Sequence, residues 1–116
     1  MVRLARNFEA NLDAIREFLG DGPRFEQLLD QLFGTILPNL DRHPELGFDL
    51  LSRRSGSVEG LARAEALRAR VGDGALREYI SGEDLVLYVV VGGDVTLLAI
   101  KHHRQLSFDL RAFWGP

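Results

Sequence analysis

The sequence predicts an α+β domain in which an antiparallel helical hairpin precedes an antiparallel β-sheet. Two observations lead to this fold class. The first half of the chain has apolar residues at helical spacing, whereas the second half has Val- and Leu-rich runs separated by turn residues. A chain of 116 residues fits a single domain, residues 1–116, and is long enough to bury a core without disulfides.

The N-terminal segment is expected to contain a short edge strand followed by a helix. Met1 to Ala5 is the candidate strand, and Asn7 is the predicted N-cap because its side chain can accept a hydrogen bond from the first helical turn. Gly20-Asp21-Gly22 predicts the end of the helix. Spacings of four, three and four place these apolar residues on one face: Phe8, Leu12, Ile15 and Leu19.

The second helix has the clearest apolar pattern in the chain. Pro23 suits its first helical position, and Pro38 predicts its end. Gly34 inside the helix costs about 1 kcal/mol of helix propensity. The apolar face is wide enough to face a core and consists of Phe25, Leu28, Leu29, Leu32, Phe33, Ile36 and Leu37. The tight turn between the two helices makes them an antiparallel hairpin.

Residues 39–57 are predicted to form an extended connection, anchored to the core by Leu50 and Leu51. A third, short helix is expected from Val58 to Val71, because this stretch is rich in Ala, Leu, Arg and Glu. Ser57 is its candidate cap.

The remainder of the chain predicts a three-stranded antiparallel meander. The expected strands are Ala75 to Ile80, Leu85 to Val91 and Val95 to His102. Gly92-Gly93 is a hairpin signal between the last two. The C-terminal LSFDLRAFW is apolar enough to pack against the domain.

Composition excludes several classes of protein and site. The chain has no cysteine, so it can form neither disulfides nor a thiolate zinc site. Its net charge of −3 is a poor basis for general nucleic-acid binding. Residues 1–52 have a net charge of −4 and residues 53–116 one of +1, so a nucleic-acid contact would need a basic patch in the second half. No apolar run has the length of a membrane span, and the N-terminus does not resemble a signal peptide, so we expect a cytoplasmic protein.

Two adjacent histidines are the first candidates for chemistry. His102 and His103 point to opposite faces of the predicted strand, so they cannot share one metal ion, and no metal site is expected. In one interpretation, one ring faces the buried side of the sheet and the other faces solvent or a partner. In the other, a histidine beside Lys101 and Arg104 transfers protons near neutral pH.

An arginine and two tyrosines are candidate binding residues. Arg77 and Tyr79 are two apart on one strand and share a face, and Tyr88 lies in the middle of the next strand. Such a group can hold a phosphate or stack on a base. The alternative is a solvated arginine with two half-buried tyrosines.

The remaining basic residues concentrate around the predicted third helix. They can contact nucleic acid, or they can form ordinary surface ion pairs with Glu59 and Glu65. The set comprises Arg53, Arg54, Arg63, Arg68 and Arg70.

Residues 77–110, REYISGEDLVLYVVVGGDVTLLAIKHHRQLSFDL, resemble the C-terminal half of the RelE/ParE toxin superfamily. The matching features are an Arg and an aromatic on one strand, a Val-rich strand with a central Tyr, a short turn, and a strand ending in Ile-x-His-x-Arg-like residues. Upstream, FEANLDAIREFL and the HPELG of residues 43–47 are similar to the family's helical hairpin and the connection after it. The RQLSFDL segment resembles members called plasmid stabilisation proteins. The matching residues are Arg77, Tyr79, Tyr88, Gly92, Gly93, Ile100, His102, His103 and Arg104.

The resemblance implies two antiparallel helices packed on a twisted antiparallel sheet of three to four strands. It also implies the toxin of a type II toxin–antitoxin pair, neutralised by an antitoxin segment that folds across the toxin. A sheet covered on one face leaves a partly apolar open face, which together with the groove beside the hairpin could bind that segment. Neither a metal nor any other cofactor is expected.

Three functions follow from the resemblance. A ParE-like toxin binds DNA gyrase without being an enzyme. A RelE-like toxin cuts messenger RNA on the ribosome; Arg77 and Arg104 would hold phosphate, with His102 or His103 and Tyr79 or Tyr88 near the proton transfers. The third is an inactive binding domain of the same fold.

Two departures bear on the target. The Ser55 to Gly72 insert is longer than the family's usual connection, and the acidic charge is unusual for toxins that cut messenger RNA.

Overall fold

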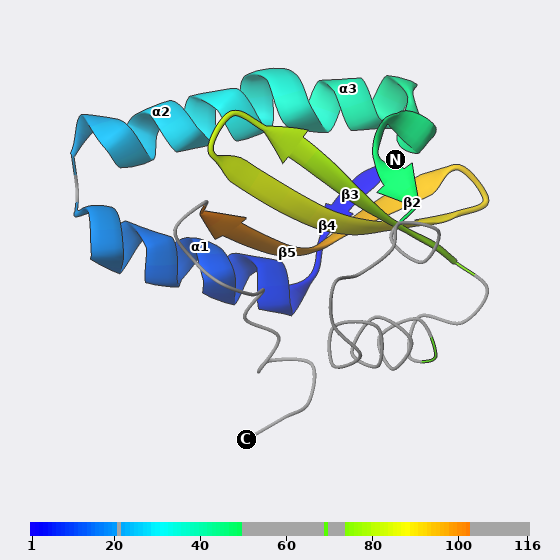
Figure 1. The fold of residues 1–116 in the computed structure, drawn as a ribbon, viewed down its shortest axis with the longest axis horizontal. Helices are drawn as coiled ribbons and strands as arrows, with labels where there is room; N and C mark the ends of the chain where they lie inside the picture. The colour runs from blue at the N-terminus through cyan, green and yellow to red at the C-terminus, as the bar shows by residue number, and fades with distance from the viewer. Residues whose placement is uncertain (21, 50–68, 70–73, 103–116) are drawn as a thin grey trace.

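The protein is an α+β domain with a mixed five-stranded sheet, seen here in a computed structural model that describes residues 1–20, 22–49, 69 and 74–102. Two helical rods follow each other in the chain, and both lie against the sheet (Figure 1). The anchors Leu50 and Leu51, the C-terminal LSFDLRAFW and, apart from Ala69, the predicted third helix and the Ser55 to Gly72 insert fall outside the described residues. No helix in the described ranges is long and apolar enough to cross a membrane.

The first strand and helix lie close to where the sequence places them. Strand β1 is Val2–Leu4 and helix α1 is Arg6–Leu19. The predicted cap is wrong: Ala5 is the N-cap, without a side-chain bond, and Asn7 is buried inside the first turn. The Asn7 side-chain amide instead donates to a carbonyl of the sheet.

The second rod continues past its predicted end. It begins at Pro23 as α2, Pro23–Gln31, widens into a π-turn, Leu32–Ile36, and continues as α3, Leu37–Arg42. Proline ends a regular helix because it lacks an N–H and its ring clashes with the carbonyl four residues earlier. In the π-turn the Leu37 N–H bonds to the Leu32 carbonyl, five residues back, and this wider turn accommodates Pro38. A 3₁₀ turn, Pro44–Leu46, follows.

The three predicted strands of the meander are confirmed. They are β3, Ala75–Ser81, β4, Asp84–Val91, and β5, Asp94–His102, and neighbours pair antiparallel. Gly92 and Gly93 both have positive φ, as a tight hairpin turn between right-twisted strands requires.

Two further strands make the sheet five-stranded and mixed, rather than antiparallel with three to four strands as expected; β1 was predicted as an edge strand, but its parallel pairing and strand β2 were not. The two-residue strand β2, Phe48–Asp49, pairs antiparallel with β3, and β1 pairs parallel with β5. The strand order is β1-β5-β4-β3-β2. Because β1 reaches the rest of the sheet only through the helices, it is free to align parallel with the last strand.

Apolar clusters lie on both faces of the sheet. Alternate residues of β4, such as Val86 and Tyr88, face the helices, while Leu87 and Val89 face the other way. The helix-side cluster is formed by Phe8, Ile15, Leu28, Leu32, Ile36, Leu40, Val86, Tyr88, Val95, Leu97 and Ile100. The second cluster, Leu76, Leu87, Val89, Leu98 and Ala99, is buried, so the expected open apolar sheet face is wrong at these positions.

Candidate functional site

The first group of predicted site residues surrounds the connection between α3 and β2. Arg77 on β3 donates through Nη1 to the carbonyls of Gly47, at 2.7 Å, and Glu45, at 3.3 Å. Tyr88 on β4 is fully buried; its hydroxyl donates to the Pro44 carbonyl at 2.7 Å and accepts from the Gly47 N–H at 2.8 Å. We call Arg77, Tyr88 and residues 44–47 the loop clamp, because both side chains bind that loop to the sheet.

The loop clamp occupies the Tyr88 hydroxyl and one nitrogen of Arg77. An arginine has five N–H donors, and two of the bonds it makes here are to loop carbonyls. The Tyr88 ring has no exposed surface on which a base could stack. Tyr79 shares their face of the sheet, and its half-buried ring packs against the helix-side cluster.

Burial raises the pKa of the Tyr88 phenol above its ordinary value of 10.0; the Gly47 bond and the Arg77 charge oppose this effect only in part. The folded protein therefore keeps its proton at a pH where the unfolded chain begins to lose it. The contribution of Tyr88 to the free energy of unfolding is fully present below about pH 10. It declines as the pH rises through the pKa of Tyr88 in the folded protein.

Substituting Tyr88→Phe removes one acceptor and one donor from the loop clamp. We expect a loss of about 1–3 kcal/mol of unfolding free energy at pH 7, because the Gly47 N–H and Pro44 carbonyl lose their partner. We also expect the stability of the variant to fall less steeply than that of the parent above pH 10. Urea unfolding at pH 7 and at pH 10–11 measures both, with Tyr79→Phe as the matched control. Equal slopes in parent and Tyr88→Phe would contradict the assignment to Tyr88.

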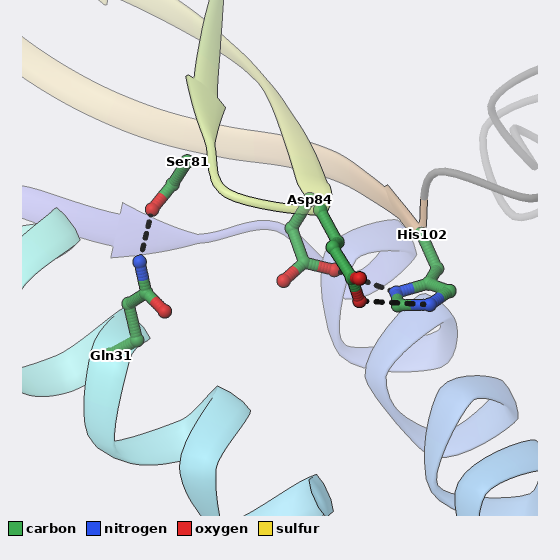
Figure 2. A network of polar contacts seen from close by, with 5 residues as sticks. Gln31, Ser81, Asp84 and His102 are labelled. Atoms are coloured by element: carbon green, nitrogen blue, oxygen red, sulfur yellow. Dashed lines mark hydrogen bonds and ion pairs between the residues drawn. The ribbon is translucent and has the colours of Figure 1, made fainter.

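The second group lies at the opposite end of the sheet, around His102. Its Nδ1 lies 3.2 Å from Asp84 Oδ1, and both side chains are largely buried, at 18% and 14% exposed. Its Nε2 lies 3.7 Å from Oε2 of Glu83, which is 70% exposed. Figure 2 shows the imidazole facing the Asp84 carboxylate at the end of the β3–β4 turn.

Gln31 connects α2 to the same end of the sheet. Its Nε2 donates to Ser81 Oγ at 2.5 Å. In Figure 2 the Ser81 hydroxyl points toward Gln31 and away from His102, so the three side chains do not form a Ser–His–Asp arrangement.

The structure separates Arg77 from His102. Arg77 is in the row of Tyr88 and Leu97, whereas Ser81, Asp84 and His102 form a row four residues further along β3. Four residues along the strand and two strands across put the backbones roughly 16 Å apart. The structure directs Arg77 to the carbonyls of residues 45 and 47 and His102 to Asp84, so it does not bring the two side chains together. His103 and Arg104 lie outside the described residues.

Four residues of the second group were not predicted: Gln31, Ser81, Glu83 and Asp84. Nothing in their sequence spacing marks them, because they meet Gln31 and His102 only through strand pairing and the packing of α2. Within the described part of the chain, no group of three or more His, Cys, Asp or Glu residues is arranged to hold a metal ion. Comparison with known proteins finds no family whose profile matches this chain and no matching curated relative.

Proposed function

We propose that the protein is the toxin of a type II toxin–antitoxin pair and that it acts by binding DNA gyrase, as a ParE-like toxin does. The observation that carries the choice of target is the loop clamp. Arg77, which would hold phosphate in an RNA-cutting toxin, and Tyr88, one of two tyrosines that could lie near the proton transfers, form internal hydrogen bonds here. A protein that acts by binding needs only a surface.

Exposed apolar side chains support a protein partner, an antitoxin or gyrase. A partner protein can bury exposed apolar side chains, although single ones are ordinary on a protein surface. They occur at the N-terminus, on α1, on the π-turn, around β2 and β3, and at the end of β4. Among the described residues they are Met1, Phe18, Phe33, Leu46, Phe48, Ile80 and Val91. We propose that the cognate antitoxin covers part of this surface in a hetero-oligomer, and that the complex works in the cytoplasm.

A second candidate is a RelE-like, metal-independent endonuclease that cuts messenger RNA on the ribosome. The pair formed by His102 and Asp84 favours it, because an imidazole beside a carboxylate is a common acid–base group. An inactive binding domain of the same fold is the remaining alternative.

Expression of the chain alone, under tight induction in bacteria without the antitoxin, tests the proposal. We expect growth arrest with intact messenger RNA and an SOS response, and normal growth when the antitoxin is co-expressed. Arrest with cut transcripts would instead support the endonuclease. Normal growth of cells that contain folded protein would refute the toxin proposal.

His102→Ala is the better variant for separating the two toxins. A gyrase binder should remain toxic when His102 is replaced, whereas an endonuclease that uses it should not. Arg77→Ala is a poor choice because it removes two bonds of the loop clamp, so a loss of toxicity would not distinguish chemistry from folding.

A further inference from the structure

The outer edge of β5 has two kinds of neighbour. Strand β1 pairs with Val95–Leu97 and ends at Leu4, while β5 continues to His102. Beyond that point two asparagines of α1 take the place of a strand. Asn7 Nδ2 donates to the Leu98 carbonyl at 3.0 Å, and Asn11 Oδ1 accepts from the Ile100 N–H at 3.0 Å.

The same stretch of β5 contains a bulge. Tyr88 pairs with Leu97 and Leu87 with Ala99, so Leu98 has no partner on β4. A bulge adds one residue to one strand and shifts the pairing of everything beyond it. The two asparagine bonds hold the residues on both sides of Ala99, and both asparagines are buried.

The shift decides which side chain meets Asp84. We count residue pairs along β4 and β5 from Val91–Asp94, beside the hairpin turn. Without the bulge, this pairing would place Lys101 opposite Asp84. The bulge puts His102 there instead. It also turns Ile100 and His102 toward the helices, since a slip of one residue exchanges the two faces of a strand.

We propose that Asp84 is a positioning residue that fixes the His102 ring with Nε2 as its reactive nitrogen, and that the asparagine-held bulge sets this pairing. An ionised carboxylate only accepts hydrogen bonds, so the neutral ring must carry its proton on Nδ1, at 3.2 Å from Asp84. The other carboxylate, Glu83, is longer at 3.7 Å and exposed, and holds the ring less firmly. The role of Nε2 in chemistry rests on the second candidate function, the endonuclease; the orientation of the ring does not.

The ring orientation can be measured without any activity. Long-range ¹H–¹⁵N spectra of labelled protein at pH 8–9 distinguish the two neutral tautomers, and His43→Gln and His103→Gln assign the three histidines. We expect the Nδ1–H form for His102 in the parent and a shift toward the Nε2–H form in Asp84→Ala. Glu83→Gln, the matched control, should leave the tautomer unchanged. An unchanged tautomer in folded Asp84→Ala would overturn the proposal.

Asp84→Leu provides a second variant in case Asp84→Ala fails to fold. It keeps most of the volume of the side chain and has no hydrogen-bond acceptor, so we expect a shift toward the Nε2–H form. The Nδ1–H form remaining alone would overturn the proposal in the same way.

A ribosome-dependent RNA cleavage assay separates this proposal from the function on which it rests. If the parent cuts RNA, we expect Asp84→Ala to cut at least about tenfold more slowly, with an altered pH profile, and Glu83→Gln to cut normally. If the parent cuts no RNA, the endonuclease function fails, and the spectra still decide whether Asp84 positions His102.

Discussion

Gly47→Ala is expected to lower the free energy of unfolding by about 1–3 kcal/mol or more, because a side chain at this position would enter the loop clamp. An added Cβ would lie 2.7 Å from the Glu78 carbonyl oxygen and 2.7 Å from the Tyr88 hydroxyl. Neither atom is the end of a flexible side chain, so the loop must move and its bonds to Arg77 and Tyr88 must weaken. Urea unfolding at pH 7 measures the effect.

Gly34→Ala is the matched control for this substitution. A Cβ at Gly34 meets no atom within 4 Å, and alanine favours helix over glycine by about 1 kcal/mol. We expect this variant to be as stable as the parent or more so. If both alanine variants changed stability equally, the close approach at Gly47 would have no energetic consequence.

Asn11→Leu is expected to destabilise the protein by about 1–3 kcal/mol, although the two side chains are similar in size. The buried Ile100 N–H loses its acceptor, and an unsatisfied buried donor costs its full desolvation energy. Hydrogen exchange should show faster exchange at the Ile100 amide, and urea unfolding should show the loss in stability. Ala14→Leu, on the exposed side of the same helix, should change stability by less than about 0.5 kcal/mol. A protected Ile100 amide in Asn11→Leu would contradict this account.

Much of the fold could be predicted because it depends on local patterns. The helical spacing from Phe8 to Leu19 and the glycines at 92 and 93 each predict an element without reference to the rest of the chain. The prediction that the second helix ends at Pro38 was wrong, because a π-turn at this position relieves the clash that proline causes in a regular helix. Strand β2 has only two residues, too short for an alternating pattern.

The candidate site was less predictable because it depends on register. Asparagine is a common helix N-cap, so the sequence predicts that role for Asn7. Only the folded structure shows that the Asn7 amide bonds to the edge of β5 instead. Asp84 and His102 meet through a bulge that no turn residue in the sequence marks. Arg77 and Tyr88 were correctly placed on neighbouring strands, but their bonds to residues 44–47 depend on the tertiary position of that loop.

The π-turn also keeps one face of a long rod pointed at the sheet. Leu28, Leu32, Ile36 and Leu40 are spaced four apart and are all buried. In a regular α-helix each step of four residues rotates the side chain about 40° too far, so Leu40 would point about 120° away from Leu28. A turn closed over five residues winds more slowly and cancels part of this drift. Deleting one residue from Leu32–Ile36 would keep Leu40 within about 20° of Leu28, because eleven residues of regular helix make three turns plus 20°, but it would remove the wide turn that accommodates Pro38.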